Sequence, residues 1–129
     1  MNKFLAFLAV LFLACASSFA GEYPDISIAE LKAAISSGKV TLVDANGSES
    51  WQKGHIPGAV DFEKSKDTLA KSLPKDKKAL VVAYCGGPKC NAYQAAAKAA
   101  KKLGYKNVKH LSAGISGWKE AGEATQKGS

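Results

Sequence analysis

The sequence predicts an α/β domain with a mostly parallel sheet flanked by helices on both faces. Two apolar runs, residues 40–45 and 79–84, are typical of buried strands. Stretches with helical periodicity alternate with these and shorter apolar runs along the chain. Such alternation is typical of parallel sheets whose strands are connected through helices. A length of 129 residues is enough for one domain but not for two.

The first half of the domain is expected to begin with an edge strand at residues 23–26. Ser27 and Glu30 match a capping box, in which a serine and a glutamate satisfy each other's backbone N–H groups. The helix that starts there should end near Gly38, and the first buried strand follows. Residues 46–53 are polar and are expected to form a loop or a short helix.

The second half alternates short strands and helices. Turn residues occupy 54–59, and Pro74 should end a helix that begins near Asp67. The last residues, 123–129, are small and polar, so we expect a frayed tail. The expected elements are a strand at 60–62, a helix at 67–73, a strand at 79–84, a helix at 92–103, a strand at 108–111 and a helix at 115–121.

The first twenty residues have the pattern of a signal peptide. Lys3 supplies the positive charge, an apolar segment follows, and small residues surround a cleavage point after Ala20. The apolar segment is too short for a membrane span. We therefore expect a mature single domain of residues 21–129 in the periplasm or secreted. Lipidation of Cys15 within a loose lipoprotein-like signal is the less favoured processing route.

All 18 basic residues are lysines, and the formal net charge is +7. This charge favours anionic small molecules as partners. The absence of arginine removes the bidentate donors that phosphates and guanine edges prefer. The lysines are also scattered rather than clustered, which disfavours a nucleic-acid interface.

A short cysteine loop joins the strand 79–84 to the helix 92–103. It begins with Cys85, Gly86 and Gly87 and ends with Lys89 and Cys90. In open parallel sheets, ligands bind where the strands end, and a helix start supplies N–H groups and positive potential. This setting favours a thiolate, so Cys85 is the predicted nucleophile. For Cys90 three roles stay open: a filler at the helix start, a resolving thiol or half of a disulfide.

Three motifs in order resemble those of rhodanese-like domains, and together they cover nearly all of the mature chain. The first is Asp44 followed by Gly54-His55-Ile56-Pro57-Gly58-Ala59, and the second is Tyr84-Cys85 with its loop. The third is Leu111-Ser112-Ala113-Gly114 with Trp118 and Gly122. The sequence departs from the family at Asn46, where arginine is common, and at Ser50, where glutamate is common.

The resemblance implies a single-domain sulfurtransferase with a central five-stranded parallel sheet. It implies that Cys85 attacks the outer sulfur of thiosulfate or polysulfide, becomes a persulfide, and passes the sulfur to a thiol or cyanide acceptor. The amides of Gly86, Gly87, Lys89 and Cys90 would surround that sulfur. Pro88 has no N–H, so this cradle has one donor fewer. No cofactor or metal is implied.

Two other functions compete with the sulfurtransferase. One is a thiol–disulfide redox protein that uses both Cys85 and Cys90, and the other is a persulfide carrier without turnover. A phosphatase of similar fold is disfavoured because its loop is one residue longer and ends in arginine, whereas Asn91 stands here. His55, next to the turn residues Pro57 and Gly58, is interpreted as a structural brace rather than a general base.

Overall fold

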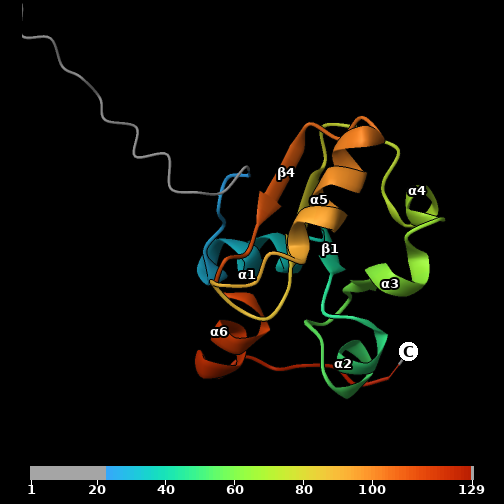
Figure 1. Cartoon of the computed structure of the whole chain (residues 1–129). Coiled ribbons are helices and arrows are strands. Elements are labelled where there is room, and N and C mark those ends of the chain that lie inside the picture. Colours follow the sequence, from blue (N-terminus) through green and yellow to red (C-terminus); the bar gives the residue numbers. More distant parts are fainter. Residues whose placement is uncertain (1–22, 129) are drawn as a thin grey trace, which may run out of the picture.

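The computed structural model describes residues 23–128 and contains, within that range, four parallel strands with helices on both faces (Figure 1). The strands are β1 (Val40–Asp44), β2 (Val60–Asp61), β3 (Leu80–Tyr84) and β4 (Asn107–His110). They lie in the order β2-β1-β3-β4. The helices are α1 (Ile28–Ser36), α2 (Ser48–Lys53), α3 (Phe62–Ser65), α4 (Leu69–Ser72), α5 (Tyr93–Lys102) and α6 (Gly114–Glu120).

The expected fifth strand at the sheet edge is reduced to a single bridge. Asp25 pairs in parallel with His110, whose N–H donates to Pro24 O at 2.8 Å and whose carbonyl accepts from Ile26 N at 2.9 Å. Pro24 lacks the N–H that would extend the ladder in one direction. In the other direction Ser27 already caps α1, since its side chain accepts from Glu30 N. The sheet of the described residues therefore has four strands and not five.

Two apolar layers cover the two faces of the sheet. Alternate residues of a strand point to opposite faces. Val81 and Ala83 of β3 accordingly pack with the buried alanines of α5, whereas Val82 and Tyr84 pack with Leu31 of α1 and with α6. Figure 1 shows α5 along one side of the sheet and α1 and α6 on the other.

The segment between β2 and β3 differs from expectation at its start. Phe62 begins α3 instead of ending a strand, because the Asp61 side chain accepts from Glu63 N and caps the helix. The helix expected at 67–73 is the single turn of α4.

None of the helices within residues 23–128 is long and apolar enough to cross a membrane. The expected signal peptide and Cys15 lie outside the described residues.

The tail, expected to fray, is held against the domain as far as residue 128. Gln126 pairs with His55 in an antiparallel bridge, with N–H to carbonyl distances of 2.8 and 2.9 Å. The indole N–H of Trp118 donates to Ala124 O at 2.8 Å. Glu123 forms a salt bridge with Lys32 of α1 at 2.7 Å. The tail thus connects α1 and α6 to the turn at 54–59.

Candidate active site

Cys85 lies directly after β3, at the carboxyl end of the sheet, with 1 % of its surface exposed. A disulfide joins it to Cys90, and the two Cα atoms are 6.2 Å apart. The structure therefore describes the oxidised form of the loop. The sequence left three roles open for Cys90, and in this form of the loop Cys90 is the disulfide partner of Cys85.

A tight turn returns the chain from Gly87 to Cys90. The Cys90 N–H donates to Gly87 O at 3.1 Å, so Pro88 and Lys89 are the central turn residues. Proline suits the first central position because its ring fixes φ near the value that the turn needs. The turn brings Cys90 back towards Cys85 and leaves the Lys89 side chain exposed.

Helix α6 orients the beginning of the cysteine loop. Ile115 N donates to Cys85 O at 2.9 Å, and Ser116 N donates to Gly86 O at 3.0 Å. The peptide bonds are trans, so each N–H points away from the carbonyl of its own peptide unit. The N–H groups of Gly86 and Gly87 therefore face away from α6, and neither forms a hydrogen bond within residues 23–128. They are two neighbouring donors available to a ligand.

Gly114, the first residue of α6, makes this arrangement sterically possible. It has a φ of +62°, in the region that favours glycine. A Cβ at this position would lie 2.5 Å from both the Gly86 carbonyl carbon and the Gly87 nitrogen. The loop and the helix approach each other so closely that no side chain fits between them.

A buried chain of hydrogen bonds supports the end of β3. The Tyr84 hydroxyl donates to Asp44 Oδ2 at 2.8 Å and accepts from Ile56 N at 3.0 Å, while Asp44 Oδ1 accepts from Asn46 N at 2.7 Å. Burial raises the pKa of Asp44, and the hydrogen bonds from Asn46 and Tyr84 oppose that effect. Burial and the Asp44 carboxylate raise the pKa of the Tyr84 hydroxyl, which stays protonated and can donate.

His55 is placed as a structural residue. The residue is 2 % exposed, and its ring stacks on Trp51 with 4.0 Å between ring centroids. Nδ1 lies 2.7 Å from Trp51 O, and the Trp51 indole donates to Ala59 O at 2.9 Å. These contacts hold the turn at 54–59 and tie it to α2.

His110 has a buried nitrogen without a hydrogen-bond partner. Its ring stacks on Tyr93 at 3.3 Å between centroids, and no donor or acceptor among the described residues reaches Nε2. Burial lowers the pKa of His110, whereas the neighbouring Asp25 carboxylate acts in the opposite direction. His110 therefore acts as a neutral packing group beneath the start of α5.

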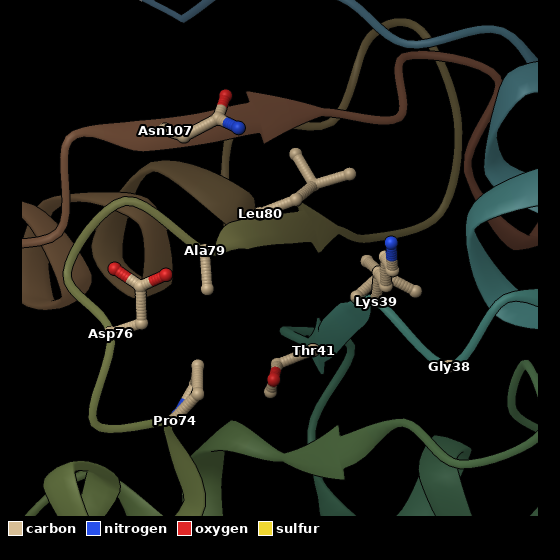
Figure 2. A pocket seen from close by; sticks show the side chains of 9 residues that line it. Gly38, Lys39, Thr41, Pro74, Asp76, Ala79, Leu80 and Asn107 are labelled. Carbon is tan, nitrogen blue, oxygen red and sulfur yellow. The ribbon is translucent and has the colours of Figure 1, made fainter.

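Two of the surface hollows of the described residues lie at opposite ends of the strands. One of about 430 Å³ includes Ala45 and Asn46 after β1 and Ala92 before α5, so it adjoins the cysteine loop. The other, of about 420 Å³, lies at the amino ends of β1, β3 and β4, and Figure 2 shows Lys39, Asp76 and Asn107 around it. Because it lies at the opposite ends of the strands, this second hollow is remote from Cys85.

Sequence reasoning did not find the residues of α6 that orient the loop. Ile115 and Ser116 act through backbone N–H groups, so their side chains carry no signal of this role. The hydroxyl of Tyr84 was also missed as a brace. A tyrosine that ends an otherwise aliphatic buried strand was the available signal, since a buried hydroxyl needs a partner.

Comparison with known proteins agrees with this geometry. The model of the rhodanese-like domain matches residues 27–121, a range that includes the whole sheet and the cysteine loop. The chain belongs to the rhodanese-like family. It has a sulfurtransferase-type fold, in which the cysteine loop follows β3.

Solved rhodanese-like structures resemble the chain over most of its length. A rhodanese-like domain from an Anabaena species is 26 % identical, with a TM-score of 0.64 over 81 % of this chain and 79 % of that domain. The human single-domain sulfurtransferase TSTD1 is 22 % identical, with a TM-score of 0.60 over 75 % of this chain and 96 % of the human one. At that identity the human protein shows the fold alone.

A curated relative is the HTH-type transcriptional regulator Rv0324 of Mycobacterium tuberculosis. It is 38 % identical over 105 residues, which are 80 % of this chain. The match spans 45 % of that protein, less than half of its length. The chain is thus similar in sequence to part of a longer protein, which is named as a transcriptional regulator.

Proposed function

We propose that the protein is a sulfurtransferase that carries sulfane sulfur as a persulfide on Cys85. The observation that carries the proposal is that this cysteine directly precedes the N–H groups of Gly86 and Gly87, which form no hydrogen bond within residues 23–128. A nucleophile beside fixed backbone donors is the arrangement that group transfer with a developing negative charge requires.

The proposed reaction has two halves. The Cys85 thiolate attacks the outer sulfur of thiosulfate, the sulfur–sulfur bond of the donor breaks, and sulfite leaves with the electron pair. The persulfide then gives its outer sulfur to a thiol or to cyanide, and the Cys85 thiolate returns. The persulfide anion is stabilised by the amides of Gly86 and Gly87 and, once the turn opens, by those of Lys89 and Cys90.

The charge of the loop suits an anionic donor. Lys89 is exposed at the tip of the turn, and no acidic residue stands between Cys85 and Cys90. Attraction of a dianion such as thiosulfate is the role we propose for Lys89. The hollow beside Asn46 and Ala92 lies at the same ends of the strands as the loop and offers an acceptor a path to it.

The disulfide requires that catalysis begin with reduction. A sulfur that is bonded to Cys90 cannot serve as a thiolate nucleophile. The same disulfide favours a second candidate function, a thiol–disulfide redox protein that uses both cysteines. The two functions differ in what they need, since a sulfurtransferase needs only Cys85 and a sulfane-sulfur donor.

The test is a turnover assay with reduced full-length protein, thiosulfate and cyanide, in which thiocyanate is measured. We expect Cys85→Ser to abolish thiocyanate formation and Cys90→Ser to retain it. Equal loss in both variants, together with exchange of disulfides with a small dithiol, would favour the redox function instead. Catalysis that persists in Cys85→Ser contradicts both.

We propose export of the protein as well, with residues 1–20 as the signal peptide and 21–129 as the mature domain in the periplasm or outside the cell. The support is the charge and apolar pattern before Ala20. The test is the mass of the protein recovered from a periplasmic fraction. A chain that begins at Gly21 supports cleavage after Ala20, and a lipid-modified chain that begins at Cys15 supports the alternative route.

A further inference from the structure

We infer that Cys90 discharges the Cys85 persulfide inside the protein, releasing hydrosulfide and forming the Cys85–Cys90 disulfide. A dithiol reductant then restores the two thiols. The inference rests on the proposed persulfide on Cys85. It adds hydrosulfide as a product and a dithiol as the class of co-substrate. Transfer of the sulfur to cyanide or to a monothiol involves neither.

The disulfide identifies the atom that Cys90 reaches. Its Sγ is bonded to Cys85 Sγ, with the backbone turn from Gly87 to Cys90 closed by a hydrogen bond of 3.1 Å. In a persulfide, Cys85 Sγ is the inner sulfur. Cys90 is therefore placed to attack this inner sulfur and not the outer one. Attack on the inner sulfur expels the outer sulfur.

The step balances in atoms and electrons. The Cys90 thiolate forms a bond to Cys85 Sγ, and the bond from Cys85 Sγ to the outer sulfur breaks. The outer sulfur leaves as hydrosulfide with the bonding electron pair, and the proton that it carries away is the one that Cys90 gives up on becoming a thiolate. The two cysteine sulfurs are oxidised by two electrons together, and the released sulfur gains those electrons.

The complete cycle consumes one dithiol for each thiosulfate. Thiosulfate and the dithiol give sulfite, hydrosulfide, one proton and the cyclic disulfide of the reductant. The reductant attacks the Cys85–Cys90 bond in the usual exchange of thiolates with disulfides. Cys90 is partly exposed and Cys85 is buried, so Cys90 is the sulfur that an external thiolate meets first.

The loop favours this internal step over an external acceptor. Cys90 is separated from Cys85 by four residues, and the turn at Pro88 and Lys89 holds it close. A group tethered this closely acts at an effective concentration in the millimolar range or above. An external monothiol competes only where its own concentration reaches that range.

A single-turnover experiment tests the inference. Full-length protein is reduced with a dithiol, freed of reductant without air, and given one equivalent of thiosulfate or, separately, of inorganic polysulfide. Sulfite from thiosulfate, hydrosulfide and the mass of the protein are then measured after alkylation. The same measurements are made on Cys90→Ser and Cys85→Ser, whose folding is checked by thermal unfolding.

With thiosulfate, we expect wild-type protein to release about one hydrosulfide for each sulfite and to end as the disulfide. Cys90→Ser should release the same sulfite but keep the sulfur as a persulfide, with hydrosulfide lowered about tenfold or more. Pro88→Gly keeps both thiols but loosens the turn, and it should lower the amount of hydrosulfide released for each sulfite.

Two outcomes would overturn the inference, and they are distinguishable. If wild-type protein holds a stable persulfide and releases no more hydrosulfide than Cys90→Ser, internal discharge is wrong while the persulfide on Cys85 stands. If no variant gains sulfur from either donor, the proposed function itself fails and the inference fails with it.

Discussion

The backbone around Cys85 is held by hydrogen bonds from residues outside the cysteine loop. Tyr84, the preceding residue, is anchored to Asp44 and Ile56, and the two carbonyls that follow are bound by α6. As a consequence the N–H groups of Gly86 and Gly87 keep one orientation. Fixed donors stabilise a developing anion without reorganising during the reaction.

Gly114→Ala tests the close approach of α6 to the loop. Its Cβ would lie 2.5 Å from backbone atoms of Gly86 and Gly87, so we expect a loss of about 2–4 kcal/mol in unfolding free energy. Sulfur transfer should fall as well. Gly38→Ala is the matched control, because its φ is +68° but no atom lies within 4 Å of the added Cβ. Equal costs in urea unfolding for the two variants would contradict the account.

Tyr84→Phe tests the brace below the loop. The change leaves the Ile56 N–H and one Asp44 oxygen without their buried partner, and we expect a cost of about 1–3 kcal/mol in urea unfolding. Tyr105→Phe removes a single hydrogen bond to Pro74 O and should cost less. If Tyr84→Phe proved as stable as the wild type, Tyr84 could not be the anchor of the strand end.

At the scale of the elements, β4 and the edge segment form the least complete part of the sheet. One bridge at Asp25 replaces a strand, and His110 at the end of β4 is buried with a nitrogen that no group among residues 23–128 pairs with. Away from that edge, the tail pairs with the turn at 54–59 through the bridge between Gln126 and His55. Both features have consequences for stability that can be measured.

We expect His110 to make the fold sensitive to acid. Burial lowers its pKa below the ordinary 6.5, so below that pH the unfolded chain binds more protons than the folded one. Stability should therefore be retained above about pH 6.5 and fall as the pH drops from there towards the folded pKa. Urea unfolding at about pH 7.5 and about pH 5.5 should show a smaller loss in His110→Phe than in the wild type. Equal losses would exclude His110 as a source of the effect.

Removal of the tail tests its role in the fold. A chain that ends at Gly122 loses the Gln126–His55 bridge, the Trp118–Ala124 hydrogen bond and the salt bridge of Lys32. We expect a loss of about 2–4 kcal/mol and a lower melting temperature. If the truncated protein had the same melting temperature as the full chain, these contacts would contribute nothing to stability in solution.

For the whole molecule, local patterns were sufficient for most of the fold. The strand 79–84 and the helix 92–103 were predicted because apolar runs and helical periodicity are local signals. The edge strand was predicted too long. Pro24 has no N–H to donate to β4, and this loss matters only because β4 is the neighbour of the segment in the folded chain. The tail was mistaken for frayed because small polar residues can still pair through their backbone, as Gln126 does.

The candidate site was predictable to a similar extent. Cys85 and its glycines were singled out by their position between a strand and a helix. The contact of Gly114 with the loop joins residues almost thirty positions apart, and no spacing rule reveals it. The disulfide between Cys85 and Cys90 was one of three roles left open, since two cysteines in one loop are compatible with all of them.

The most direct measurement is the mass of intact, reduced Cys90→Ser protein before and after thiosulfate, and again after a dithiol. Without Cys90 the persulfide has no internal partner, so the account predicts a gain of one sulfur that the dithiol removes. The gain should be absent from the double variant Cys85→Ser,Cys90→Ser. A protein that gains no sulfur, or gains it equally without Cys85, would contradict the claim that this cysteine carries the sulfur.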